Sequence, residues 1–350
     1  MNINMEMTNL TSESLTEGPL PWLSSSYERV VAMFRQDRLP HALLIEGAQG
    51  VGKYPLAMML SAFVLCERNK EQDLPCGQCK HCALFQTGSH GGFREIRRGE
   101  KDSVIKIDAI RSLSDFAVGT SYLGGYKVVV VNPAEDMNIS AANALLKTLE
   151  EPSKSTFIIL LSHSGGSLLP TIRSRCQSIT VGMPSEQSVI PWLESQCSAE
   201  KPDIRRAVAM SSGSPLSALS LLETESLARV DKMLDELSLV LKRSVPLSEA
   251  AERWAKDGLE DYLLWLSQCA HQLVSYAMTG DDSLLVHTKS KKMFSYLAQR
   301  CSYVQLVDLY ALCFAQLTAA KSTNNPNPVL TCERALSAWL ALMLKSSQRA

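Results

Sequence analysis

The sequence lacks an excess of charge of either sign, because 35 lysines and arginines stand against 36 aspartates and glutamates. A chain with a formal net charge of −1 is not a polycation that coats DNA unaided. No uninterrupted apolar run approaches the ~18 residues that span a bilayer. The N-terminus has neither the basic nor the apolar region of a secretory signal. These absences predict a cytoplasmic protein with no membrane segment.

Motifs of several enzyme classes are also missing. The chain contains no G-x-S-x-G, no H-E-x-x-H and no basic strip interleaved with aromatic residues. Wholesale disorder is excluded, because 45% of the 350 residues are apolar. That content is enough to bury a core in each of two or three domains.

After a polar tail at 1–18, short apolar runs alternate with amphipathic helical segments and predict an α/β domain at 19–183. The expected strands lie at 41–46, 104–107, 127–131 and 156–162. The last two are apolar on successive residues, as in strands of a parallel sheet covered on both faces. Between them we expect a helix that Ser140 caps and that ends near Glu151, before Pro152.

Strand signals disappear after Pro184. Helical periodicity at 185–198, 202–211 and 215–223 predicts a small three-helix domain at 184–224. Longer helical patterns then predict an all-α domain at 225–350, with helices at 225–243, 247–257, 259–279, 291–300, 302–321 and 328–346.

A phosphate-binding loop is the first motif that indicates chemistry. The strand HALLIE leads into GAQGVGKY, which fits G-x-x-x-x-G-K-[ST] except at its last position. Gly47, Gly50 and Gly52 let backbone N–H groups surround phosphate oxygens, and Lys53 could reach the outer phosphates. A hydroxyl at position 54 would hold Mg²⁺, but the oxygen of Tyr54 lies too far out along its side chain.

The acidic pair that such an ATPase needs at the end of a buried strand is missing too. Asn132 and Pro133 stand at those positions, and neither can act as a base. Glu135 and Asp136 are expected to be loop acids in solvent. The sequence therefore predicts a P-loop domain that has lost hydrolysis, and leaves open whether it still binds nucleotide.

A cluster of cysteines predicts a metal site. Cys76, Cys79 and Cys82 lie within seven residues, and Cys66 ends the preceding helical run. Four thiolates suit tetrahedral, structural Zn²⁺. The all-cysteine set is favoured over sets using His81 or His90, and the alternatives are an iron–sulfur cluster or reduced thiols in a surface loop. The other six cysteines fall on apolar patterns and are expected in the core: Cys176, Cys197, Cys269, Cys301, Cys313 and Cys332.

An arginine of the segment TIRSRC after the strand at 156–162, which contains Arg173 and Arg175, is a candidate for stabilising phosphoryl-transfer charge. Near a P-loop it could act in cis, or reach the nucleotide of a neighbouring chain in trans. From spacing alone, an ordinary solvated surface arginine is the favoured interpretation.

Taken in order, these motifs resemble the clamp-loader subunits of bacterial DNA polymerase III, a branch of the AAA+ family. The resemblance covers about 20–223 and includes HALLIEGAQGVGK, CGQCKHC, YKVVVVNPAEDMNISAANALLKTLEEP, TIRSRC and GSPLSALSLL. The ATPase subunits of that family carry Ser or Thr, Asp-Glu and a sensor arginine where this chain has Tyr54, Asn132-Pro133 and Leu216. The segment Ser174-Arg175-Cys176 is retained.

The resemblance implies a degenerate ATPase, a P-loop AAA+ domain with a zinc module at 66–82, a three-helix lid and a C-terminal collar. It implies that Arg175 acts as an arginine finger in trans on the ATP of a gamma or tau subunit. The partners would be gamma or tau and delta subunits in a ring of five, which loads the beta sliding clamp on primed DNA. The chain would then be a subunit of the DNA-directed DNA polymerase (nucleotidyltransferase) holoenzyme without catalysis of its own.

Two other hypotheses remain at this point. One is an active AAA+ clamp-loader ATPase with an unusual P-loop, and the other is a zinc-dependent nucleic-acid module that acts alone. ATP turnover by the isolated chain distinguishes the first, and salt-dependent DNA binding by the monomer distinguishes the second.

Overall fold

The computed structural model describes residues 16–99, 102, 104–119, 125–153, 155–163, 166, 168–224, 226–285, 290–321 and 326–347. These residues divide into two compact units. One runs to Val189 and includes Ser214–Ser217; the other comprises Ile190–Gly213 and the chain from Ala218 onwards. Most of the tail expected at 1–18 lies outside the described residues. The division into domains at 19–183, 184–224 and 225–350 stays a prediction.

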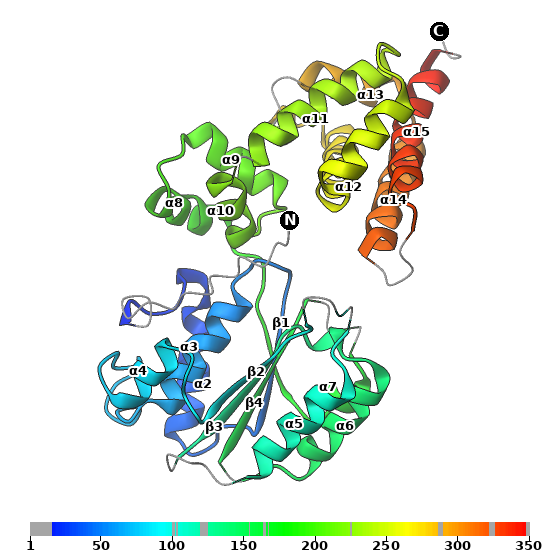
Figure 1. Ribbon diagram of the computed structural model, residues 1–350. Coiled ribbons are helices and arrows are strands. Elements are labelled where there is room, and N and C mark those ends of the chain that lie inside the picture. The colour runs from blue at the N-terminus through cyan, green and yellow to red at the C-terminus, as the bar shows by residue number, and fades with distance from the viewer. Residues whose placement is uncertain are drawn as a thin grey trace. The chain divides into compact units, whose positions relative to one another are not determined.

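The first unit is built on a parallel sheet with the strand order β2-β3-β4-β1-β5 (Figure 1). The strands are β1 (Ala42–Glu46), β2 (Phe93–Ile96), β3 (Lys127–Val131), β4 (Thr156–Ser162) and β5 (Gln177–Thr180). Every residue of β3 and β4 is buried, as their continuous apolar sequences predict for strands covered on both faces. The α/β class with a parallel sheet is thereby confirmed.

Helices cover both faces of the sheet, and alternate residues of each strand point to opposite faces. Leu43 and Ile45 pack with α2 (Ser24–Arg35) and α3 (Lys53–Leu65) in one apolar core. Ala42 and Leu44 pack on the other face, against α5 (Ile107–Val118), α6 (Ile139–Glu150) and α7 (Pro170–Arg173). Figure 1 shows α2 and α3 on one side of the sheet and α5, α6 and α7 on the other. Three further short elements belong to this unit: η1 (Pro21–Leu23), α4 (Lys80–Gln86) and η2 (Ala134–Asp136).

The strand predicted at 104–107 is wrong. Ile105 forms a single bridge with Met137, and Ile107 already begins α5. The strands at the two edges, β2 and β5, did not stand out in the sequence because FREI and QSIT are short and no more than half of their residues are apolar. Edge strands have one neighbour each, so their apolar signal is weaker than that of the central strands.

The helix cap predicted at Ser140 is also wrong. Asn138 is the N-cap of α6, and its Oδ1 accepts a hydrogen bond from the amide of Ala141 at 2.8 Å. Ser140 lies exposed inside the first turn. The predicted end of this helix is confirmed, since α6 ends at Glu150 with Glu151 as its C-cap.

The rest of the described chain is helical. Its elements are α8 (Glu186–Gln196), α9 (Lys201–Met210), α10 (Pro215–Glu223), α11 (Ser226–Leu241), α12 (Leu247–Thr279), η4 (Asp282–Leu284), α13 (Lys291–Arg300), α14 (Tyr303–Lys321) and α15 (Pro328–Ser347). Gly258 interrupts α12 with a φ of 128°, at the break predicted between 247–257 and 259–279. Trp254, Trp265 and Trp339 are buried in the core of this unit.

One helix, α14, is long and apolar enough to cross a membrane by length and composition alone. No such helix was expected from the sequence. The core helices of water-soluble proteins pass the same test, and α14 buries one stripe of its surface in the helical core. That stripe contains Leu306, Leu309, Cys313 and Leu317.

Candidate functional site

The predicted P-loop leaves the carboxyl end of β1 and leads into α3, as the motif requires. Gly50 and Gly52 have φ values of 74° and 98°, a left-handed conformation that side chains other than glycine rarely adopt. A Cβ added at Gly50 would lie 2.2 Å from Ser217 Oγ and 2.3 Å from Ser214 Oγ. Glycine is therefore required at position 50 by the backbone and by the close approach of the chain's own serines.

Lys53, the lysine of the motif, is buried, with 2% of its surface exposed. Its Nζ donates to the carbonyl oxygens of Gly47 at 2.8 Å and Ala48 at 2.7 Å. The same nitrogen lies 2.9 Å from Nδ1 of His163, which directly follows β4. Lys53 thus ties the loop to itself and to the end of the neighbouring strand.

The remaining loop carbonyls also accept hydrogen bonds from the chain. Ser214 Oγ donates to the oxygen of Gln49 at 2.8 Å, and the amide of Leu216 donates to the oxygen of Gly50 at 3.0 Å. Trp22 Nε1 donates to the oxygen of Val51 at 2.9 Å. Five consecutive carbonyls, from residue 47 to residue 51, therefore have donors from the protein, and the loop holds its shape through the chain's own contacts.

Lys53→Met should lower the free energy of unfolding by about 2–4 kcal/mol, because it removes a buried charged donor from two carbonyl oxygens. The matched variant is Lys127→Met, since the buried Lys127 also donates to backbone carbonyls, those of Phe116, Ala117 and Gly119. Chemical denaturation of both variants checks the expectation. A Lys53→Met protein as stable as the wild type, beside a destabilised Lys127→Met protein, would contradict it.

The hydroxyl of Tyr54 contacts β2 instead of the loop. The Tyr54 ring is buried under the guanidinium of Arg97, at 4.5 Å, and its hydroxyl lies 3.4 Å from Glu95 Oε2 on β2. β2 is the edge strand furthest from β5 and is separated from β1 by β3 and β4. Burial, with the nearby Glu95 carboxylate, raises the pKa of Tyr54 to about 12, so the side chain stays a neutral phenol.

The end of β3 carries no acid, as predicted. Asn132 is buried and its backbone N–H donates to the carbonyl oxygen of Ile96 at 3.0 Å. The expectation that Glu135 and Asp136 lie in solvent is wrong, because η2 folds them back onto the sheet edge and both are half-buried. Glu135 Oε1 accepts from the amide of His163 at 2.7 Å. Burial raises the pKa of Asp136, which lies 3.5 Å from Arg98.

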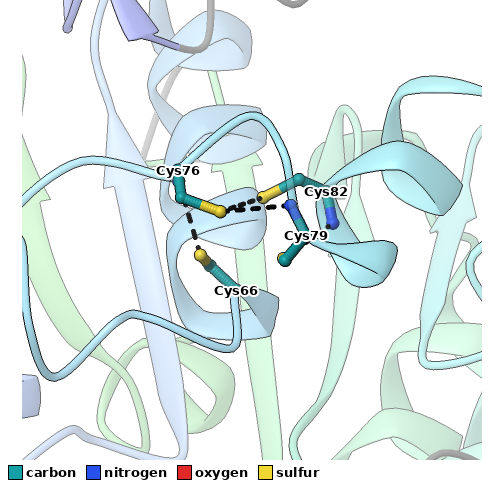
Figure 2. Close-up of side chains that lie close together, drawn as sticks. All are labelled: Cys66, Cys76, Cys79 and Cys82. Atoms are coloured by element: carbon teal, nitrogen blue, oxygen red, sulfur yellow. Dashed lines mark hydrogen bonds between the residues drawn. The ribbon is translucent and has the colours of Figure 1, made fainter.

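The four predicted cysteine ligands come together (Figure 2). Cys66 follows α3, Cys76 lies in the loop before α4, and Cys79 caps α4, which contains Cys82. All four sulfur atoms lie within 4.8 Å of one another, and the sulfurs of Cys76 and Cys82 are 3.9 Å apart. A tetrahedral zinc with Zn–S bonds of ~2.3 Å needs sulfurs about 3.8 Å apart, so this group of four fits zinc.

Backbone amides also favour thiolates in the cluster. Cys66 Sγ accepts from the amides of Arg68 and Cys76, both at 3.4 Å. The amides of Cys79 and Cys82 donate to the sulfurs of Cys76 and Cys79, at 3.3 and 3.4 Å. The hydrogen bond with the Cys82 thiol lowers the pKa of Cys66 and raises that of Cys82. Thiolate is the form that binds zinc.

The two histidines near the cluster contact each other. His81 Nδ1 lies 2.9 Å from His90 Nε2, and His90 Nδ1 accepts from the amide of Gly92 at 3.0 Å. His81 Nε2 faces Glu67 at 3.4 Å. These contacts favour the all-cysteine ligand set that the sequence predicts.

The six other cysteines differ in how deeply they are buried. Cys269, Cys313 and Cys332 are buried as predicted, whereas Cys176, Cys197 and Cys301 are only half-buried.

Arg175 lies near the amino ends of the strands, whereas the predicted P-loop of its own chain follows the carboxyl end of β1. Gln177 is level with Leu43, and Thr180 is level with Glu46. Arg175 precedes the start of β5 while the loop follows the end of β1, so at ~3.3 Å per residue about 13 Å or more of strand separates them. This arrangement argues against action in cis.

The two arginines of the TIRSRC segment have different carboxylate partners. Arg173 reaches Glu46, at the end of β1, with 3.6 Å between Nη2 and Oε1. Arg175 reaches Glu150, at the end of α6, with 2.7 Å between Nη2 and Oε1, and its Nη1 donates to the oxygen of Thr171 at 3.0 Å. Arg175 is the arginine directed away from the chain's own loop.

Sequence reasoning missed the residues that hold these sites in place. His163, Glu150 and Trp22 lie 110, 25 and 29 positions from the residues that they contact. Only His163 carried a usable signal, since it directly follows a buried parallel strand, at the sheet edge where the P-loop also lies.

Comparisons with known proteins agree with the motifs. The family model described as DNA polymerase III, delta subunit, matches residues 23–184. The DNA polymerase III subunit delta' of Pseudomonas aeruginosa is 33% identical over 303 residues, which cover 86% of this chain and 92% of that protein. The subunit delta' of Yersinia pestis is 31% identical over 337 residues, covering 92% of this chain and 96% of the relative.

Among solved structures, a DNA polymerase III gamma subunit-related protein of Thermotoga maritima matches 91% of this chain and 99% of its own, with 18% identity and a TM-score of 0.44. The sequence identity to the delta' subunits extends over nearly their whole length, including the helical part beyond residue 184. The chain therefore belongs to the delta' family of DNA polymerase III.

Proposed function

We propose that this protein works in DNA replication as a non-hydrolysing subunit of a clamp loader. It supplies Arg175 in trans to the ATP site of a neighbouring gamma or tau subunit, and zinc in the Cys66, Cys76, Cys79 and Cys82 cluster stabilises its fold. The ring, which includes a delta subunit, loads the beta sliding clamp on primed DNA. Family membership supports the clamp-loader role.

The observation that carries the proposal is the separation of Arg175 from the P-loop of its own chain. Arg175 lies near the amino ends of the strands and its guanidinium is half-exposed. It is therefore too far from the loop of its own chain to act on a nucleotide bound there. The loop side supports the same conclusion, because Tyr54 faces Glu95 and Asn132 stands where a carboxylate would orient water. Lys53 is occupied by loop carbonyls and His163.

ATP turnover by the isolated chain tests the loss of hydrolysis. We expect none above background, because position 54 lacks the Ser or Thr hydroxyl that would hold Mg²⁺ and β3 is followed by Asn132 and Pro133 instead of carboxylates. The matched measurement uses the chain mixed with gamma or tau and delta subunits, where turnover should appear. Turnover by the isolated chain in the ordinary ~1–10³ s⁻¹ range, abolished by Lys53→Ala but not by Arg175→Ala, would favour an active ATPase instead.

A further inference from the structure

Arg175 is fixed by two contacts within its own chain. Its Nη2 lies 2.7 Å from Oε1 of Glu150, and its Nη1 donates to the carbonyl oxygen of Thr171 at 3.0 Å. A guanidinium is planar and carries five N–H donors in a rigid fork. Two contacts through its two terminal nitrogens therefore set the plane of the group and leave further donors available to a partner, since 36% of the side chain is exposed.

The position of Glu150 is not one that helix stability favours. It is the last residue of α6 and is followed by a second acid, Glu151. A carboxylate at a helix C-terminus meets the negative end of the helix dipole, where cations are preferred. An ion pair this exposed also adds little to stability. Neither consideration explains a carboxylate placed within hydrogen-bond reach of Arg175.

The ion pair between Glu150 and Arg175 restricts the rotamers of the Arg175 side chain. A free arginine carries about 2 kcal/mol of rotamer entropy, which it must lose when it stabilises charge in a transition state. Groups that act on developing charge are most effective when their orientation is already set. The contacts from Glu150 and Thr171 set that orientation before any partner is bound.

We propose that Glu150 is a positioning residue, which holds the Arg175 guanidinium in the orientation needed to reach the ATP of a neighbouring subunit. The inference rests on the proposed trans role of Arg175. Glu150 acts through Arg175 alone and touches neither ATP nor metal. Because Thr171 contributes a backbone oxygen, Glu150 is the side chain through which this orientation can be altered.

The test is ATP hydrolysis by the reconstituted complex containing Glu150→Ala, with Glu151→Ala as the matched control. Both variants remove one exposed carboxylate from the end of α6, and alanine is well tolerated in helices. In single-turnover measurements, we expect Glu150→Ala to slow the fast phase of hydrolysis at the adjoining site about 3- to 10-fold, since part of the rotamer entropy must then be lost in the reaction. The KM for ATP should not change, and Glu151→Ala should match the wild type.

Combining the substitutions shows whether Glu150 works through Arg175. In the Arg175→Ala background, adding Glu150→Ala should have no further effect. A second loss in that background would mean that Glu150 acts through folding or assembly, and would overturn the positioning role. If Arg175→Ala slows hydrolysis while Glu150→Ala behaves like Glu151→Ala, the positioning role of Glu150 is overturned but the trans role of Arg175 is not. If Arg175→Ala leaves hydrolysis unchanged, both the trans role and its positioning by Glu150 are overturned.

Discussion

Arg175→Ala is expected to slow ATP hydrolysis at the adjoining site of the assembled clamp loader by up to ~10³–10⁵-fold, the range that arginine fingers supply. Such an arginine stabilises charge that develops on the transferring phosphoryl group. That charge develops only during the reaction, so the affinity for ATP should change far less than the rate of hydrolysis. The side chain is half-exposed and its ion pair with Glu150 contributes little stability, so folding and ring assembly should be retained.

The measurement is single-turnover hydrolysis by the reconstituted complex, because other ATP sites in a ring continue to turn over. One site should lose its fast phase. Arg173→Ala is the matched control, since Arg173 lies two residues earlier and contacts Glu46 of its own chain. Arg175→Lys keeps the charge but loses the planar fork and should recover only part of the rate. Equal fast phases in the wild-type and Arg175→Ala complexes would rule out the trans role.

Cys79→Ser is expected to release one equivalent of zinc and to lower the free energy of unfolding by more than about 4 kcal/mol, as the loss of a structural metal does. Four sulfurs within 4.8 Å of one another leave no position for a substrate. Cys79 also caps α4 through its sulfur, which accepts from the amide of Cys82. The substitution should therefore loosen α4 and the segment at 66–82, and the melting temperature should fall by about 8–16 °C.

Elemental analysis and thermal unfolding of the purified proteins check this prediction. Cys197→Ser is the matched control, because Cys197 is half-buried outside the cluster and its sulfur donates to the oxygen of Leu193 at 3.3 Å, a bond that a serine hydroxyl can replace. The Cys197→Ser protein should keep its zinc. Absence of zinc from the wild type, or equal zinc in the Cys79→Ser protein, would refute the metal assignment.

The central part of the fold could be predicted from local sequence because its signals are local. β3 and β4 are apolar on every residue or nearly so, since helices cover both of their faces, and the predicted and observed bounds agree. The edge strands β2 and β5 have one neighbour each, carry mixed sequences and went unpredicted. The segment at 104–107 has an apolar pattern like a strand, yet Ile105 forms only an isolated bridge, with Met137, which lies outside the strands of the sheet.

Sequence alone determined which side chains could do chemistry here. The spacing of Cys66, Cys76, Cys79 and Cys82 predicted a candidate metal-ligand set, and their sulfurs do come together. Tyr54 and Asn132 stand where an ATPase would need a metal-binding hydroxyl and a carboxylate. These are properties of residue type and short separation, which a sequence displays directly.

The tertiary structure decided what surrounds those residues. It placed Arg175 near the amino ends of the strands, away from the predicted P-loop, with its guanidinium against Glu150. The ammonium group of Lys53 contacts the loop carbonyls and His163. The same structure turned Glu135 towards the amide of His163 instead of solvent. Apart from the bonds between Lys53 and the loop carbonyls, these contacts join residues far apart in the chain, and the parallel pairing of β3, β4, β1 and β5 helps to bring them within reach.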